Sequence, residues 1–457
     1  MTVPPSHATS APTVGGVAAL RYLVRLMGPA VLSGVILRRP TMTALAQRWS
    51  VDTATGSAVR ELRRRFGGAP VRLQVSGREL VIPVRAADVE RILAQPPEVA
   101  DPANREKVGA LGLFQPHGVL VSRGAVRVRR RDFVEDVLET DREMHSLAGH
   151  AVRVVDEEVA ALLPVTGEAT VTADEFLRAW WRVVRRITLG DSARDDEAVT
   201  DTLRRLRGWA NWSVLAPRRR RLRQRLERDL YDYVDAAEPG SLAAIVARSG
   251  AGAGVDPVGQ LPHWLFAFDA AGLAAVRALA LLATHPEARE RARTEATTGD
   301  GPRTLPYLRA TILDSLRLWP TTPAILRDAA RDLQLDGPDG TEGPVIVPKG
   351  SAVAVLASAF HRDPGLPFAD RFAPEIWTDG TAEQYPQLVP FSAGPVVCPG
   401  QNLVLLVTSS LLAAVLRSTD PVLTDGAPLS PTTPLPASLN PFGLAFGVTA
   451  RPEGPTS

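Results

Sequence analysis

The 457-residue sequence contains one cysteine, Cys398, so no disulfide bond can form within the chain. Lysine is also scarce: of 52 Lys and Arg residues only Lys107 and Lys349 are lysine, a bias that we attribute to codon usage more than to function. A low cysteine content fits a reducing compartment, and we expect a cytoplasmic location. The formal net charge is only +2, which gives no global electrostatic reason to expect a nucleic acid partner.

Long clean apolar runs are missing as well. Residues 14–37 are rather apolar but are interrupted by Arg21, Arg25 and Gly28-Pro29, so we interpret them as a surface-packed helix, with a membrane-surface helix as the alternative. Residues 264–283 are nearly long enough to span a membrane but contain Asp269 and Arg277. A buried helix in mid-chain explains this run better, and we predict no transmembrane segment.

The periodicity of apolar residues predicts a mainly α protein with small β-sheets. We expect a variable lead-in with helical character at residues 1–43 and a single domain at residues 44–457. The expected helices include 44–66, 86–94, 122–138, 264–283, 286–297 and 304–319. Alternation predicts a hairpin at 71–84, and strand character returns at 345–357 and 444–448.

Residues 390–400 read PFSAGPVVCPG and are followed directly by apolar residues at helical spacing. This pattern places Cys398 at the N-terminus of a helix, where the helix dipole and free N–H groups favour the thiolate that ligates metals. Gly394 and Gly400 remove Cβ atoms on both sides of the sulfur and allow a tight loop. Without this context, a lone cysteine would be interpreted as a small buried hydrophobe.

The spacing of Phe391, Gly394, Cys398 and Gly400 resembles the F-x-x-G-x-x-x-C-x-G haem-binding loop of the cytochrome P450 family. The resemblance, to soluble bacterial members, implies haem b between the long central helix and the helix that follows Cys398, with Cys398 as the axial metal ligand. The sequence departs from the family at Val396, where many members carry Arg or His.

Two arginines correspond to positions where the family holds haem propionates. Val126 and Arg130 occupy the two ends of the family's W-x-x-x-R motif, so the charge is kept and the indole is lost. Arg327 stands where family members place another propionate-binding arginine. The other arginines of residues 122–138 form either a solvated face or a docking surface for an acidic electron donor.

Asp314 and Arg317 lie three residues apart and are neighbours on a helix surface, as in any common ion pair. Their position before Cys398 corresponds to the family's E-x-x-R motif, with Asp in place of Glu. The usual P-E-R-[FW] has become Pro374-Glu375-Ile376-Trp377, and Arg371 is a candidate to replace the missing arginine.

The largest departure lies in residues 271–275. The family's oxygen-binding turn reads A-G-x-[DE]-T, and its acid and alcohol supply protons during dioxygen activation. Here Ala271 and Gly272 are kept, which implies room for dioxygen, but Ala274 and Ala275 carry no proton-handling group. Asp269 is an alternative proton relay or, as a simpler interpretation, a buried carboxylate in an ion pair.

The resemblance implies a monooxygenase that uses O2 and a ferredoxin or other separate electron donor to oxidise a small lipophilic substrate. The absent acid and alcohol keep two alternatives open. One is a haem-thiolate peroxygenase, isomerase or dehydratase, and the other is a non-catalytic haem or partner-binding protein.

Overall fold

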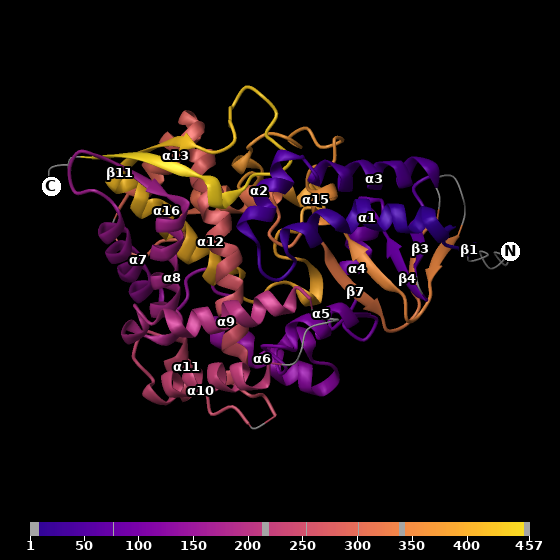
Figure 1. The fold of residues 1–457 in the computed structure, drawn as a ribbon, viewed down its shortest axis with the longest axis horizontal. Coiled ribbons are helices and arrows are strands. Elements are labelled where there is room, and N and C mark those ends of the chain that lie inside the picture. Colours follow the sequence, from indigo (N-terminus) through magenta and orange to yellow (C-terminus); the bar gives the residue numbers. More distant parts are fainter. Residues whose placement is uncertain are drawn as a thin grey trace.

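The computed structural model describes residues 9–75, 77–212, 219–252, 254–299, 301–337 and 343–451. It is mainly helical with small β-sheets, as the sequence predicts (Figure 1). The helices are α1 (Gly16–Ser33), α2 (Pro40–Arg48), α3 (Asp52–Arg65), α4 (Ala86–Leu93), α5 (Arg105–Leu111), α6 (Gly124–Leu138), α7 (Ala148–Leu162), α8 (Ala173–Leu189), α9 (Glu197–Ala210), α10 (Arg220–Ala236), α11 (Leu242–Arg248), α12 (Leu261–Thr284), α13 (Pro286–Thr297), α14 (Pro306–Leu318), α15 (Ala357–Phe360) and α16 (Gln401–Ser418). The strands are β1 (Thr9–Ser10), β2 (Thr13–Val14), β3 (Val71–Val75), β4 (Arg78–Ile82), β5 (Ala100–Asp101), β6 (Glu168–Thr172), β7 (Ile325–Ala329), β8 (Leu333–Asp336), β9 (Pro344–Val347), β10 (Ala352–Val355), β11 (Thr419–Asp425) and β12 (Ala445–Ala450).

The main sheet has the strand order β2-β3-β4-β10-β7-β5 and lies at the right of Figure 1. Strands β3 and β4 form the predicted hairpin, with Val75 paired to Arg78; Ser76 of its turn lies outside the described residues. Strand β10 runs parallel to β4 and antiparallel to β7. Smaller sheets have the orders β1-β9-β8 and β11-β12-β6.

Helix α12 is the centre of the helical half and packs against α8, α14 and α16 (Figure 1). It is apolar on nearly every side, which is typical of a helix buried within a large core. Pro262 stands in its first turn, and Pro286, which opens α13, follows its C-cap His285. This helix therefore forms a rigid wall for any site beside it.

The helix expected at residues 44–66 is two helices, α2 and α3. Ser50 between them adopts a left-handed conformation with φ of 47°, which no α-helix can contain. The prediction of helical structure was correct, whereas the continuity was wrong, because no glycine or proline marks the break.

The N-terminal segment is integrated into both the sheets and the helices. Strand β1 pairs with β9, Thr9 opposite Val345, and β2 pairs with β3. Beyond α1, which packs on α3, the side chain of Asn211 accepts from Ile36 N (2.8 Å) and donates to Leu37 O (2.9 Å). A domain boundary at residue 43 stays a prediction.

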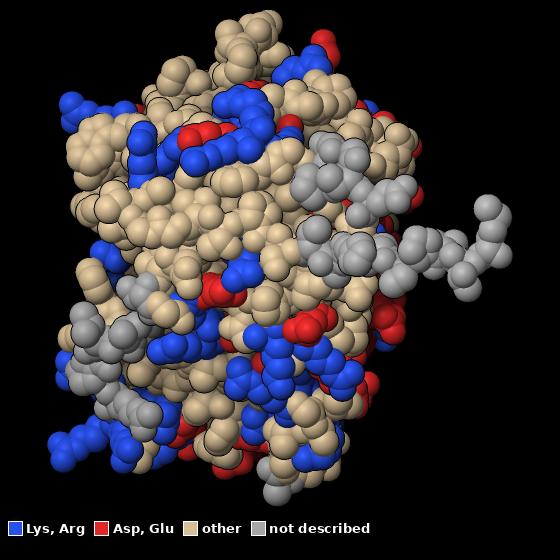
Figure 2. All heavy atoms as spheres, turned by 90° about the vertical axis from the view of Figure 1, so that its right-hand side faces the viewer, with Lys and Arg blue, Asp and Glu red and all other residues tan. Residues whose placement is uncertain are grey.

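Three described helices are long and apolar enough to cross a membrane, judged by length and composition alone: α1, α12 with the turn before it, and α16. The fold buries 72% of the apolar window at α12 and 78% of that at α16, against 28% at α1. Figure 2 shows the face at the right of Figure 1, where described Lys and Arg side chains lie in separate groups with uncharged surface between them.

Candidate functional site: a haem-thiolate centre

The loop before α16 holds Cys398 in a defined position. Cys398 N donates to Phe391 O (2.9 Å), and Val397 N donates to Gly394 O (3.0 Å). Gly394 has φ of 64°, and a Cβ atom there would collide with Leu93 O of α4. Only glycine fits this close approach. Helix α16 begins three residues after the sulfur with Gly400 as its N-cap, which confirms the predicted placement of Cys398 before a helix.

Cys398 is a free, partly accessible cysteine. Burial raises the pKa of its thiol, and the Gly400 N–H together with the charge of Arg131 partly oppose this shift. Arg131 also donates to Val397 O (2.9 Å) and so keeps its positive charge close to the sulfur. A soft sulfur with a hydrogen-bond donor and a nearby cation suits an iron ligand.

Three cations from separate elements lie near one another, with Arg127 and Arg327 buried and Lys107 half-buried. Arg327 on β7 is 3% exposed and donates to Ser392 Oγ (3.2 Å), while Lys107 on α5 donates to Pro102 O (3.0 Å) and Leu326 O (2.9 Å). Arg127 on α6 is 5% exposed, and its one hydrogen bond among the described residues is a long one to Val119 O (3.4 Å).

The pKa shifts show that these cations repel one another. Burial, with the charge of Arg127 as the next cause, lowers the pKa of Arg327 to about 10. Burial, with Arg327 as the next cause, lowers the pKa of Lys107 to about 7. A ligand that brings negative charge would relieve both effects.

Arg130 lies elsewhere on α6. Its guanidinium donates to Ser122 Oγ (2.7 Å) and Val255 O (3.1 Å). The assignment of Arg130 to a haem propionate stays a prediction, but the structure places Arg127 closer to the role. Sequence reasoning missed Arg127 and Lys107, although Lys107 is one of only two lysines.

These residues fit haem. The group needs a ligand for its iron and partners for two carboxylates, and the structure offers Cys398 together with three cations, the buried Arg127 and Arg327 and the half-buried Lys107. The glycine cradle at Gly394 fixes the loop that carries the sulfur.

The Asp314–Arg317 pair is fully buried and bidentate. Arg317 Nε donates to Asp314 Oδ1 (2.6 Å) and Nη2 donates to Oδ2 (3.1 Å). Arg317 also donates to Ala369 O (3.1 Å) and Arg371 O (2.6 Å), so it ties α14 to the segment before the cysteine loop. The shorter Asp thus keeps the charge-assisted contact expected of the motif.

Trp377, not Arg371, completes this network. Trp377 Nε1 donates to Asp314 Oδ1 (3.2 Å), and Ala373 N donates to Oδ2 (2.9 Å). The Arg371 side chain is exposed and donates to Pro367 O (2.5 Å). The expectation that the Arg371 guanidinium replaces the missing arginine is therefore corrected: this residue contributes its backbone carbonyl only.

The oxygen-binding turn lies within α12. Ala271 and Ala275 are buried one turn apart, and Ala274 O accepts a hydrogen bond from Ser315 Oγ (3.0 Å). Gly272 faces α8, because a Cβ atom there would lie 2.5 Å from Trp180 Cδ1. The expectation that Gly272 makes room for dioxygen is corrected: its missing side chain accommodates the indole of Trp180, which donates to Phe268 O (2.8 Å).

Asp269 forms an ion pair. Its Oδ2 accepts from Arg207 Nη2 on α9 at 2.6 Å, and Arg207 is 3% exposed and also donates to Ile36 O (2.9 Å). Of the two interpretations of Asp269, the structure favours the paired carboxylate over the proton relay.

The protein is mainly helical and its cysteine loop fits a haem-thiolate centre, and comparisons with known proteins agree with this. The family model described as Cytochrome P450 matches residues 273–439. Probable cytochrome P450 4s3 of Drosophila melanogaster is 34% identical over 154 residues, which is 33% of this chain and 30% of that protein. Cytochrome P450 714C2 of Oryza sativa subsp. japonica is 26% identical over 358 residues, 68% of this chain and 66% of that protein.

Solved structures extend the likeness to the whole fold. Cyanobacterial CYP120A1 with bound retinoic acid aligns at a TM-score of 0.66 with 19% identity, over 86% of this chain and 94% of that protein. A zebra fish cytochrome P450 with progesterone also aligns at 0.66 with 19% identity, over 87% of this chain and 99% of that protein. Residues 273–439 thus match the cytochrome P450 family, and the described chain has the fold of solved cytochrome P450 structures. The alignment with the Drosophila protein spans under a third of that relative.

Proposed function

We propose that this protein is a haem-thiolate monooxygenase that inserts one oxygen atom of O2 into a small lipophilic metabolite. The observation that carries the proposal is Cys398, held before α16 by the Gly394 loop and accompanied by buried cations. Haem b bound through a thiolate supplies the activation of dioxygen.

The residues of the proposed haem site have separate roles. Cys398 would hold the haem iron through its sulfur, and Arg127, Arg327 and Lys107 would hold the haem carboxylates. Ala271 and Ala275 present an apolar surface on α12 that limits water at the reacting centre.

Residues beside the N-terminal half of α12 support the proposed substrate class. Phe114 and Phe266 lie edge to face at 6.0 Å, and His263 packs on Phe266 at 5.9 Å. Burial lowers the pKa of His263 to about 4, so it is neutral at pH 7. The Gln115 amide is buried with no hydrogen-bond partner in the described part of the chain. The Arg207 guanidinium lies over the Phe266 ring at 4.8 Å. Aromatic side chains with these few polar groups suit a lipophilic molecule that carries a hydrogen-bonding group.

The electron donor is a separate protein, for which we propose a ferredoxin-type partner. Helix α6 exposes Val126 (37%) and Val128 (52%) beside the exposed Arg129. Basic and apolar side chains together suit an acidic donor. Arg129→Glu should slow reduction by the donor, most strongly at low ionic strength. Equal reduction rates for the wild-type protein and the variant would exclude this face of α6 as the docking surface.

A second candidate function does not need a proton relay: peroxide-driven oxidation, isomerisation or dehydration. The pairing of Asp269 with Arg207 favours it, because this carboxylate is already engaged and Ala274 and Ala275 offer no replacement.

Purified protein separates these functions. The reduced protein with carbon monoxide should show the thiolate Soret band, and Cys398→Ala should abolish it; a band that persists would overturn the site assignment. Turnover that requires O2 and a surrogate ferredoxin supports the monooxygenase. Turnover that continues without any reductant would replace it by the second function.

We propose a cytoplasmic location, supported by the single cysteine. Cell fractionation tests this. Recovery with membranes would contradict it and direct attention to α1, whose outward face carries Val17, Leu20 and Val24.

A further inference from the structure

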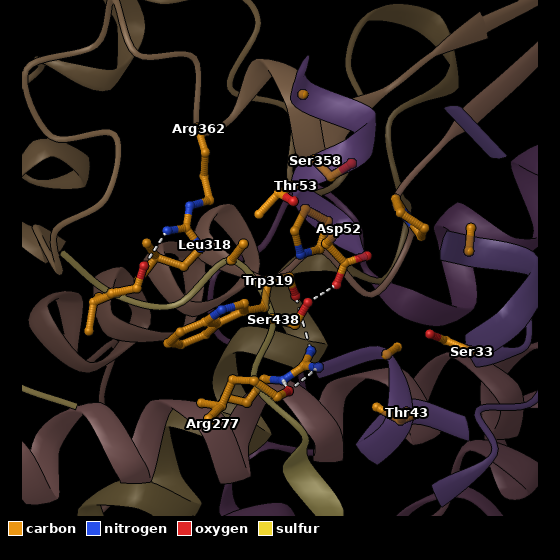
Figure 3. Close-up of a pocket in the computed structure, with 18 of the residues that line it drawn as sticks. Ser33, Thr43, Asp52, Thr53, Arg277, Leu318, Trp319, Ser358, Arg362 and Ser438 are labelled. Carbon is orange, nitrogen blue, oxygen red and sulfur yellow. Dashed lines mark hydrogen bonds between the residues drawn. The ribbon is translucent and has the colours of Figure 1, made fainter. Parts of the chain in front are cut away.

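A separate cavity of about 290 Å³ lies between α1, α2, α3 and α12 (Figure 3). We call it the α2–α12 pocket. Its walls include Leu273 and Arg277 of α12, residues 318–320 at the end of α14, and residues 437–439. Its volume is near the lower end of the ~300–1,000 Å³ of small-molecule sites.

Arg277 reaches into this pocket from α12. Its Nε and Nη2 donate to Leu439 O (3.0 and 2.7 Å), and Nη1 donates to Trp319 O (3.1 Å). Figure 3 shows its guanidinium below Ser438 and Asp52. Its hydrogen bonds therefore go to neutral carbonyl groups, which leave its charge uncompensated.

Arg38 lines the same pocket from the segment that joins α1 and α2. Its Nη2 donates to Thr321 O (3.2 Å), which is its one acceptor within the described ranges. A guanidinium has five N–H donors, so most of those of Arg38 are available to a ligand. Arg38 forms no ion pair with any described carboxylate.

The carboxylates around the pocket are largely committed to other partners. Asp370 pairs with Arg362 (2.6 Å), and Asp269 pairs with Arg207 (2.6 Å). Asp52 accepts a hydrogen bond from Ser438 Oγ and is the one lining carboxylate without an ion pair among the described residues. Arg38, Arg277 and Arg60 line the pocket without an ion pair among the described residues, whereas only Asp52 offers a free carboxylate, so the pocket carries excess positive charge.

We propose that the α2–α12 pocket binds a small anion, a carboxylate or phosphate group, between Arg38 and Arg277. Guanidinium groups bind such planar or tetrahedral oxyanions through paired N–H donors. Burial, with repulsion from Arg38 as the next cause, lowers the pKa of Arg277 to about 9. An anion would remove this repulsion and satisfy the free donors of Arg38.

Titration calorimetry of the haem-loaded protein with inorganic phosphate and with acetate tests the site. At least one should bind, and Arg38→Gln should weaken binding on the order of tenfold to a hundredfold, the worth of a charged hydrogen bond. Asp52→Asn should strengthen binding, because it removes the competing negative charge. Arg39→Gln is the matched control: this neighbouring arginine lies over the Trp212 ring, does not line the pocket and should leave binding unchanged.

A long-chain carboxylate and its methyl ester distinguish the source of the anion. If the anion belongs to a substrate, phosphate should compete with the acid but not with the ester; if it is a free effector, phosphate should compete with neither. Absence of binding by both anions, or equal binding by wild-type protein and folded Arg38→Gln, would overturn the proposal. Arg38→Lys, which keeps a charge, should retain part of the affinity. The readout is binding, so a failure of the proposed oxygenase activity leaves it interpretable.

Discussion

The network around Asp314 predicts that Trp377, rather than Arg371, supports the buried ion pair. Four donors reach the Asp314 carboxylate, which matches its four acceptor positions: Arg317 Nε and Nη2, Ala373 N and Trp377 Nε1. Replacement of Trp377 by phenylalanine removes one of them and keeps a ring in place. We expect a loss of about 1.5 kcal/mol in the free energy of unfolding, the lower value for a bond to a charged acceptor, because this bond is long.

Two further variants give a larger and a smaller expected loss in the free energy of unfolding for comparison with Trp377→Phe. Asp314→Ala leaves Arg317 buried without its counter-charge and should cost about 3–5 kcal/mol. Arg371→Ala removes an exposed side chain and should change stability by less than about 0.5 kcal/mol. Urea unfolding followed by fluorescence measures each change, and the carbon monoxide spectrum of the reduced protein reports whether the cysteine loop is retained. A loss for Arg371→Ala as large as that for Trp377→Phe would refute this interpretation of the network.

Three other predictions follow from buried groups. Gly272→Ala should lower the melting temperature, since its Cβ would press on the Trp180 indole, and Trp180→Phe should restore part of the loss in calorimetry. The pKa of Lys107 is lowered to about 7 from 10.5, so the unfolded chain binds more protons between these values. In the haem-free protein, Lys107 should therefore make the free energy of unfolding rise as pH increases from about 7 to 10.5. Lys107→Met should remove this pH dependence. Asp269→Asn should leave peroxide release unchanged, because the carboxylate pairs with Arg207; an increase would restore Asp269 as a proton relay.

The cysteine loop could be predicted because its chemistry is local. The spacing from Phe391 to Gly400, the proline after Cys398 and the apolar run that follows are all contained in one short stretch. The hairpin at β3 and β4 and the helix α13 were predicted for the same reason: the pattern and its end signals lie within the segment.

The roles of Arg127 and Arg130 could not be separated in this way. Both lie on the face of α6 that also carries Phe133, Val134 and Val137, so helical periodicity favours neither. The distinction arises from tertiary contacts, because Ser122 and Val255 hold Arg130 while Arg127 lies near Arg327. The hydrogen bond from Trp377 to Asp314 could not be predicted either, because it is also a tertiary contact between segments far apart in the sequence.

The pairing of β1 with β9 has a consequence for the order in which the protein is made. Thr9 leaves the ribosome first, but its partner Val345 follows 336 positions later, the difference between the two residue numbers. At about 5–20 residues per second, the first strand waits roughly 20 to 70 s for its neighbour. Throughout that interval β1 lacks its partner strand, whereas α1 already has α3 to pack on and β2 has β3 to pair with. Strand β1 is thus among the last parts of the described chain to find its partner, although it is among the first to be synthesised.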